Sequence, residues 1–273
     1  MDQTLKLGLV QMTSSDTYAD NIEFVGEVIK EAASKGADMV ALPEVSGMMN
    51  RKIEEIREQI KGEAEDPFIR ACCEFAREFG VWIHTGSTPI TQLQDQKFLN
   101  HSNLIDGRGK IVAAYDKIHL FDMYPATGKP LLESKRYQAG SKAVLAQTPW
   151  GGLGMSVCYD LRFPHLYRTY AQEGANMLFI PSAFTVPTGQ AHWDVLLRAR
   201  AIENGAFVIA SAQVGVHKDG RETYGHSMVV DPWGRILCNM KECVGVNMVE
   251  LDMSLVEKAR SHVPSLTHDV PIY

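Results

Sequence analysis

The sequence predicts an α/β protein, and two patterns carry the prediction. Short apolar runs typical of buried strands alternate with segments whose apolar residues recur at helical spacing. The first such unit joins a strand at 5–12 to a strand at 39–42 through one helix, which makes a βαβ unit with a short crossover. The same alternation returns after residue 158. We therefore expect two similar β-α-β halves.

Boundary signals support the helices of the first half. Asp20 or Asn21 can cap a helix that ends at Gly36. Asp66, followed by proline, begins a second helix that ends at Gly80. Cysteines 72 and 73 fall within that helix, where we expect them to be part of the core.

The rest of the chain continues the alternation. In chain order we expect a strand at 81–88, a hairpin over 98–116 turning at Asp106-Gly107, a long loop at 118–141, a strand at 152–157, a helix from 164 to about 172, a strand at 176–184, a helix at 191–204, a strand at 206–214, a hairpin over 226–251 and a last short helix capped by Ser254. A loop as long as 118–141 is usually functional in a compact domain.

Length and composition favour one domain spanning 1–273. The chain is 45% hydrophobic and 22% charged, and it contains no linker-like stretch at which to divide it. A net charge of −6 argues against binding to nucleic acid or to an anionic membrane. No segment approaches the roughly 18 apolar residues of a membrane span, and the first residues do not resemble a signal peptide. We therefore expect a cytoplasmic protein.

Cofactor motifs are missing from the sequence. The five cysteines are an odd number without CxxC spacing, and the nine histidines lack metal-ligand spacing. Neither of the nucleotide-binding motifs GxGxxG and GxxxxGK[ST] occurs, so the sequence does not support a nucleotide-dependent enzyme. We expect no metal and no cofactor, and a reducing compartment.

Cys158 is the first candidate for chemistry. It lies between the strand at 152–157 and a helix that Pro164 begins. The positive end of that helix predicts a stabilised thiolate, against an ordinary thiol pKa of about 8.5. The alternative is a buried structural cysteine, which is the more common role of an isolated cysteine.

Two further strands end in reactive side chains. Glu44 follows the strand at 39–42, and Lys117 follows the hairpin at 98–116. Ligands and catalytic groups gather at the carboxyl ends of strands in open α/β sheets. Glutamate, lysine and cysteine at three strand ends therefore favour a catalytic role for Cys158.

These residues lie in motifs that resemble the nitrilase superfamily. The motifs are LPE with Glu44, KIHLFD with Lys117, LLES with Glu133, CYDLRFP with Cys158, and the segments at 181–204 and 224–234. They look most like the branch that contains deaminated glutathione amidase, with omega-amidase as a near relative. One difference is Asp116, where relatives commonly have arginine before the lysine.

The resemblance implies a fold, an assembly and a mechanism. The fold would be a four-layer α-β-β-α sandwich, and many relatives form homodimers. Glu44 would act as general base, Cys158 as nucleophile, and Lys117 with the backbone N–H of Tyr159 would hold the oxyanion. Glu133 would orient Lys117 or the substrate amide; the alternative for it is an exposed surface acid.

Five residues are candidates for substrate binding. Arg162 could hold a substrate carboxylate in a bidentate contact, or could instead bind Asp160 or the Glu44 loop. The other candidates are Tyr159, Phe184, Thr185 and His192, the last of which we place on the first turn of its helix.

The expected activity is that of a thiol-dependent amidase acting on a small carboxylate-bearing amide through a thioester, similar to deaminated glutathione amidase. Omega-amidase and N-carbamoyl amidohydrolase are alternatives. A Cys-His hydrolase with His119 or His192 as base would leave Glu44 and Lys117 unexplained. A non-catalytic scaffold with this fold is the remaining alternative.

Overall fold

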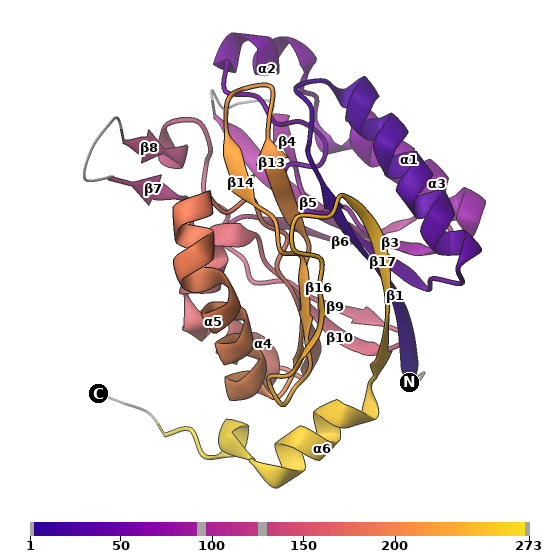
Figure 1. Ribbon diagram of the computed structural model, residues 1–273, viewed down its shortest axis with the longest axis vertical. Helices are drawn as coiled ribbons and strands as arrows, with labels where there is room; N and C mark the ends of the chain where they lie inside the picture. Colours follow the sequence, from indigo (N-terminus) through magenta and orange to yellow (C-terminus); the bar gives the residue numbers. More distant parts are fainter. Residues whose placement is uncertain (1–2, 92–96, 125–129, 271–273) are drawn as a thin grey trace.

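Two β-sheets face each other at the centre of the protein. In the computed structural model, which describes residues 3–91, 97–124 and 130–270, the larger sheet has the order β14-β13-β1-β2-β3-β5-β4, with β17 paired to β1 and β6 paired to β5. The smaller sheet has the order β16-β15-β12-β11-β10-β9. A two-stranded ribbon, β7-β8, lies beside them (Figure 1).

The strands are β1 (Thr4–Met12), β2 (Met39–Ala41), β3 (Trp82–His84), β4 (Thr88–Thr91), β5 (Phe98–Ile105), β6 (Ile111–Asp116), β7 (Asp122–Met123), β8 (Leu131–Leu132), β9 (Leu145–Thr148), β10 (Gly151–Met155), β11 (Ala175–Phe179), β12 (Phe207–Ala210), β13 (Ala212–Val216), β14 (Glu222–Tyr224), β15 (Met228–Val230), β16 (Ile236–Asn239) and β17 (Gly245–Asp252). The α-helices are α1 (Tyr18–Ser34), α2 (Ile53–Gln59), α3 (Pro67–Phe79), α4 (Pro164–Gln172), α5 (Val186–Asn204) and α6 (Ser254–His262). Short 3₁₀ turns are η1 (Glu63–Glu65), η2 (Glu133–Lys135), η3 (Cys158–Arg162) and η4 (Ser265–Thr267).

Helices cover the outer face of each sheet. The pair α1 and α3 packs on the larger sheet, and the pair α4 and α5 packs on the smaller one (Figure 1). The order of layers is therefore α-β-β-α, which confirms the four-layer sandwich.

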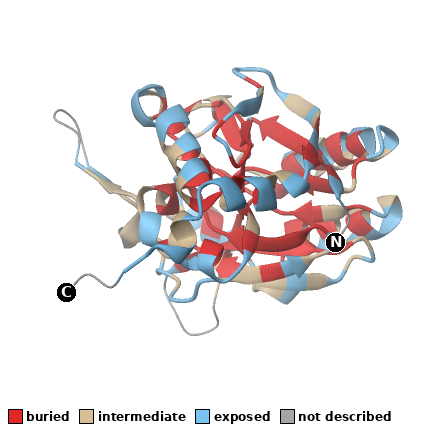
Figure 2. Cartoon of the chain, turned by 90° about the horizontal axis from the view of Figure 1, so that it is seen from below, coloured by how far each residue is buried: buried red, intermediate tan, exposed pale blue. Residues whose placement is uncertain are grey.

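Strand β1 shows how one alternating sequence builds two layers of core. Leu5, Leu7 and Leu9 point to the core between the sheets, whereas Val10 and Met12 pack with the helices of the larger sheet. Successive side chains of a strand point to opposite faces, so a strand that is apolar on both faces belongs at the centre of such a sandwich. Figure 2 shows the buried residues gathered between the layers and the exposed ones outside.

Several element boundaries differ from the predictions. Thr17 rather than Asp20 or Asn21 caps α1, because its hydroxyl accepts from the Asp20 N–H. Helix α5 begins at Val186, five residues earlier than predicted, with Pro187 in its first turn. Within 118–141 the described residues form β7, β8 and η2 rather than a plain loop. Cys72 is buried as predicted, and Cys73 is half-buried.

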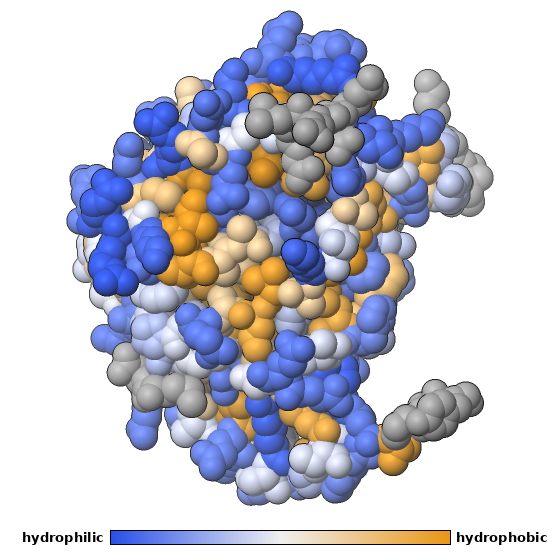
Figure 3. Space-filling view, turned by 180° about the vertical axis from the view of Figure 1, so that it is seen from behind, coloured by the Kyte–Doolittle hydropathy of each residue, from blue (hydrophilic) through white to orange (hydrophobic). Residues whose placement is uncertain are grey.

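The outer surface mixes charged and apolar residues. On the side opposite that of Figure 1, apolar side chains gather in the middle of the face with hydrophilic ones around them (Figure 3). Among the described residues, none of the helices has the length and apolar character to cross a membrane.

Candidate active site

Glu44 lies in a tight turn that directly follows β2. The next residue, Val45, has φ of +53°, a left-handed conformation that is strained for a β-branched residue. Its N–H donates to Ser87 Oγ at 2.9 Å, and Gln213 Nε2 donates to the Glu44 carbonyl at 2.9 Å. The segment between β3 and β4 and strand β13 thereby fix the turn, and Glu44 is 5% exposed.

Lys117 follows β6 and is buried together with two carboxylates. Its Nζ lies 2.8 Å from Glu44 Oε1, and 3.0 and 2.9 Å from the two oxygens of Glu133. Burial alone would lower the pKa of Lys117, but the negative charges of Glu133 and Glu44 raise it well above the ordinary value. The side chain is therefore an ammonium ion.

Glu133 begins η2, in the segment predicted as a long loop. Its Oε2 also accepts from the N–H of Phe121, so the carboxylate links two parts of that segment as well as binding Lys117. Its side chain is only 14% exposed. The alternative of an exposed surface acid is therefore wrong for Glu133.

Cys158 begins η3, three residues after the end of β10. It has φ of +48°, and its N–H donates to the Pro181 carbonyl at 2.9 Å. A non-glycine residue in this conformation is uncommon, and such residues often occur at functional sites. The thiol is buried, and the charges of Glu44 and Lys117 both influence it.

The predicted stabilised thiolate is wrong for the resting protein. Burial and the negative charge of Glu44 raise the pKa of the Cys158 thiol well above its ordinary value, although Lys117 and the backbone N–H of Ala183 act in the opposite direction. The residues after Cys158 form a 3₁₀ turn, and α4 begins only at Pro164. The thiol is therefore protonated at rest and needs a base.

Asp160 holds the η3 turn in place. Its Oδ2 accepts from the Tyr115 hydroxyl at 2.7 Å and the Val157 N–H at 2.8 Å. Its Oδ1 lies 3.0 Å from the N–H of His119 and 2.7 Å from His119 Nδ1. The residue is fully buried, so these contacts fix the position of Cys158 relative to β6.

His119 is already engaged in these contacts. Besides Asp160, its ring stacks on Phe163 with centroids 3.5 Å apart. This arrangement fits a structural imidazole better than the base of a Cys-His hydrolase.

Arg162 is surrounded by aromatic groups. Its guanidinium lies 5.4 Å from the ring centroid of Phe184 and 5.9 Å from that of Tyr159, and its Nη2 lies 3.3 Å from His192 Nδ1. The structure thus brings together four of the predicted substrate-binding residues. Within the described part of the chain the guanidinium has no carboxylate partner, so the alternative contact with Asp160 is not formed.

The predicted position of His192 needs correction, whereas Thr185 stays a candidate. Thr185 is the residue before α5, and its hydroxyl lies 2.8 Å from that of Thr188. His192 lies on the second turn of α5 rather than the first, because the helix begins earlier than predicted.

Asn100 and Gln213 belong to this site but were not predicted. Asn100, on β5, donates from Nδ2 to Glu44 Oε1 at 3.0 Å and to Glu133 Oε1 at 3.4 Å. Gln213, on β13, contacts the Glu44 turn. Gln213 is a polar residue in an otherwise apolar strand, and Asn100 begins a run of four polar residues in the fully buried strand β5; these patterns were the available signal.

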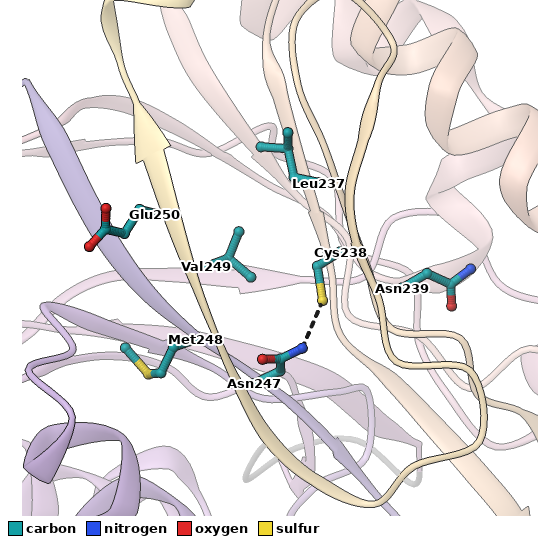
Figure 4. Close-up of a pocket in the computed structure, with 7 residues that line it drawn as sticks. All are labelled: Leu237, Cys238, Asn239, Asn247, Met248, Val249 and Glu250. Carbon is teal, nitrogen blue, oxygen red and sulfur yellow. Dashed lines mark hydrogen bonds between the residues drawn. The ribbon is translucent and has the colours of Figure 1, made fainter.

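A separate surface groove lies between β16 and β17 (Figure 4). Seven residues line it: Leu237, Cys238, Asn239, Asn247, Met248, Val249 and Glu250. Asn247 Nδ2 lies 3.3 Å from Cys238 Sγ. None of the predicted catalytic residues lines the groove, so it is distinct from the candidate site. Among the described residues no group of three His, Cys, Asp or Glu side chains could hold a metal ion.

Comparison with known proteins agrees with the fold and with the resemblance. The carbon-nitrogen hydrolase family model matches residues 6–261. The deaminated glutathione amidase of Synechocystis sp. is 39% identical over 96% of this chain and 96% of that protein, and that of Yersinia enterocolitica is 38% identical over 96% and 92%. The crystal structure of Caenorhabditis elegans NitFhit has a TM-score of 0.90 at 36% identity. The match covers 98% of this chain and 65% of the longer NitFhit chain. Saccharomyces cerevisiae Nit3, a member of branch 10 of the nitrilase superfamily, has a TM-score of 0.86 at 29% identity and covers 96% and 95%. The chain therefore belongs to the carbon-nitrogen hydrolase family, within the nitrilase superfamily.

Proposed function

We propose that this protein is an amidase that hydrolyses a small carboxylate-bearing amide through a thioester on Cys158. The observation that carries the proposal is the buried ammonium of Lys117, held by Glu44 and Glu133 beside a protonated cysteine thiol. Nucleophile, base and oxyanion partner are the three groups that acyl transfer from an amide requires.

In the first half of the reaction Glu44 takes the proton of the Cys158 thiol as sulfur attacks the carbonyl carbon. Lys117 and the backbone N–H of Tyr159 bind the negative oxygen of the tetrahedral intermediate. Glu44 then gives its proton to the nitrogen, the C–N bond breaks, and a thioester remains on Cys158. The raised pKa of the thiol supports this role of Glu44, because a protonated nucleophile depends on an adjacent base.

In the second half water replaces the amine. Glu44 takes a proton from water, the hydroxide oxygen attacks the thioester, and Lys117 again binds the oxyanion. The C–S bond breaks, the carboxylic acid leaves, and the proton on Glu44 returns to Cys158. Glu133 contributes by orienting Lys117, to which it bonds through both oxygens.

The substrate class rests on Arg162 and on the relatives. A half-buried guanidinium without a carboxylate partner among the described residues is suited to a carboxylate of the ligand. Two of the relatives reported above, those of Synechocystis and Yersinia, are named deaminated glutathione amidase, so we propose an activity of that kind. Omega-amidase and N-carbamoyl amidohydrolase activities would use the same three catalytic groups.

Three further proposals concern the whole protein. A single domain over 1–273 is supported by one core cluster that extends from β1 to α6. The assembly we propose is a homodimer, and the compartment is the cytoplasm. Light scattering of the purified protein would test the assembly, because a monomer at micromolar concentration would contradict it.

The decisive experiment is to trap the acyl-enzyme. The protein would be incubated with a panel of anionic and neutral amides while ammonia or amine release is measured, and then acid-quenched for mass spectrometry. We expect an acyl adduct on the peptide that contains Cys158, and no turnover by a folded Cys158→Ala variant. An adduct on Cys238 or Cys243 instead, or full activity of the variant, would refute the mechanism.

A further inference from the structure

Asn100 contacts three of the four groups to which we assign the chemistry or its support. Its side-chain Nδ2 donates to Oε1 of both Glu44 and Glu133, at 3.0 and 3.4 Å. Its backbone carbonyl accepts from the Lys117 N–H at 3.0 Å. The residue is 2% exposed, so water does not compete with these contacts.

The orientation of the Asn100 amide follows from its neighbours. Ionised carboxylates only accept hydrogen bonds, so the NH₂ end must face Glu44 and Glu133. The opposite end, Oδ1, is then buried with no partner among the described residues. Such an oxygen lowers stability, and an apolar side chain of similar size would avoid that cost. Packing alone therefore does not explain an asparagine at this position.

The two carboxylate oxygens of Glu44 differ in their hydrogen bonds. The hydrogen bonds from Lys117 Nζ and from Asn100 Nδ2 both end on Oε1. Within the described part of the chain, no nitrogen or oxygen donor bonds to Oε2. One oxygen of the carboxylate is thus fixed, and the other is available to exchange a proton.

The charge of the cluster makes the Asn100 donors important. Glu44 and Glu133 carry two negative charges against one positive charge on Lys117, all with little solvent. Among the described residues, the Cys158 thiol and the Tyr137 hydroxyl also interact electrostatically with these carboxylates. Burial and the charge of Glu133 raise the pKa of Tyr137 to about 12. Neither group adds a positive charge, so the N–H groups of Asn100 supplement Lys117 as hydrogen-bond donors to the two carboxylates.

We propose that Asn100 is a positioning residue for the general base, which holds Oε1 of Glu44 in place and leaves Oε2 as the oxygen that takes the proton of Cys158. The inference rests on the proposed function in one respect, the assignment of Glu44 as the base. Its consequence is that removing the Asn100 donors frees the Glu44 carboxylate from its fixed orientation and removes a stabilising contact to its negative charge, so the reaction of Cys158 should become more sensitive to acid.

The test compares Asn100→Leu and Asn100→Ala, which remove the donors without adding a charge, with a matched control, Asn103→Leu. Asn103 lies on the same strand, is fully buried, donates to the carboxylate of Glu63 at 3.4 Å, and also has an unpartnered Oδ1. It therefore reports the general cost of replacing a buried asparagine in β5. Two profiles would be measured between pH 5 and 9: kcat/KM for an amide substrate, and the rate at which iodoacetamide alkylates Cys158, followed by mass spectrometry of its peptide.

In both Asn100 variants we expect the acid-side midpoint of each profile to move up by about one to two pH units, because a hydrogen bond to a charged group is lost. Rates at pH 7 should fall about ten- to a hundredfold, while Asn103→Leu keeps the wild-type midpoint. A midpoint that stays in place in a folded Asn100 variant would overturn the inference, whatever the loss of rate. Should Asn100→Leu fail to fold, the smaller Asn100→Ala gives the answer.

The alkylation profile separates this inference from the proposed function. If wild type hydrolyses no amide of the panel but the alkylation midpoint moves only in the Asn100 variants, the amidase proposal fails and the positioning role stands. If wild type hydrolyses amides and neither midpoint moves, the amidase proposal stands and the positioning role is wrong.

Discussion

The Nζ of Lys117 lies 2.8 Å from Oε1 of Glu44, at a place where the two side chains are only 2% and 6% exposed. A buried ion pair is costly to desolvate, and its members depend strongly on each other once buried. Glu133 adds a second carboxylate to the same ammonium, with both oxygens within 3.0 Å. The stability of this region and the proposed chemistry therefore depend on the same lysine.

Replacing Lys117 by alanine should affect both properties. We expect kcat to fall at least about a hundredfold, because an oxyanion donor is lost. The free energy of unfolding should fall by about 3–5 kcal/mol, because two carboxylates remain buried without their cation. Lys117→Arg should not restore the rate, since a planar guanidinium does not fit a site shaped for an ammonium. Urea denaturation and steady-state kinetics would measure these effects, with exposed Lys110→Ala as control. A Lys117→Ala variant as stable as the control would contradict the ion-pair argument.

Glu44→Gln tests the base without changing the size of the side chain. The amide cannot take the proton of Cys158, so kcat should fall at least about a hundredfold. Exposed Glu54→Gln, on α2, is the control for the same chemical change. Near-normal rates in Glu44→Gln would move the base to a histidine, and His119→Ala and His192→Ala would then be the decisive variants.

The sequence predicted the candidate catalytic residues that follow the ends of strands. Glu44, Lys117 and Cys158 each follow a strand, and the structure brings all three to one buried site. Asn100 and Gln213 lie within strands, so their role depends on which residues the neighbouring strands place beside them, and no local pattern encodes that.

The ionisation of Cys158 could not be predicted from its position before a helix. The effect of a helix end on a thiol is modest and falls off within a turn, whereas burial next to a carboxylate acts at contact distance. Sequence patterns predicted the turn, but they did not show how deeply Cys158 is buried or that Glu44 lies beside it.

Asp160→Asn should loosen the turn that carries Cys158. The carboxylate accepts hydrogen bonds through both oxygens, and an amide would present N–H groups to donors such as the Tyr115 hydroxyl and the His119 N–H. We expect a loss of about 1–3 kcal/mol in unfolding free energy and a lower kcat, measured by thermal denaturation and kinetics. Asp194→Asn, at an exposed position of α5, is the matched control. Equal stability of the two variants would show that Asp160 does not hold η3.

His101 should make stability depend on pH. Burial alone would lower its pKa, but the hydrogen bond to Asp116 and the nearby carboxylate of Glu63 outweigh burial and raise it to about 9. Asp116 Oδ1 lies 2.7 Å from His101 Nδ1, so the two residues are paired across the β5–β6 ladder.

The direction of this pH dependence follows from the raised pKa. The folded protein holds the His101 proton more tightly than the unfolded chain does, so this stabilisation is complete below pH 6.5 and is lost as pH rises through about 9. The contribution is about 3 kcal/mol. Unfolding free energies at pH 6, 7.5 and 9 should therefore decrease in wild type, and the decrease should be smaller in His101→Asn. The same slope in both proteins would contradict the assignment, and His268→Asn, an exposed histidine, is the control.

Arg162→Ala tests the proposed substrate class. The guanidinium lies against Phe184 and Tyr159, near Cys158 in the chain, and within the described residues no carboxylate neutralises it. A charge-assisted bidentate contact is worth about 1.5–3 kcal/mol, which corresponds to about ten- to a hundredfold in affinity. We therefore expect the KM of an anionic amide to rise by that factor in Arg162→Ala, while the KM of its neutral ester or amide analogue changes little. Arg198→Ala, on the exposed side of α5, should leave both values unchanged.

Two outcomes would contradict the proposed substrate class. If Arg162→Ala raises the KM of both substrates equally, or if wild type prefers neutral aliphatic amides, then Arg162 has a structural role and a general amidase or carbamoylase describes the protein better.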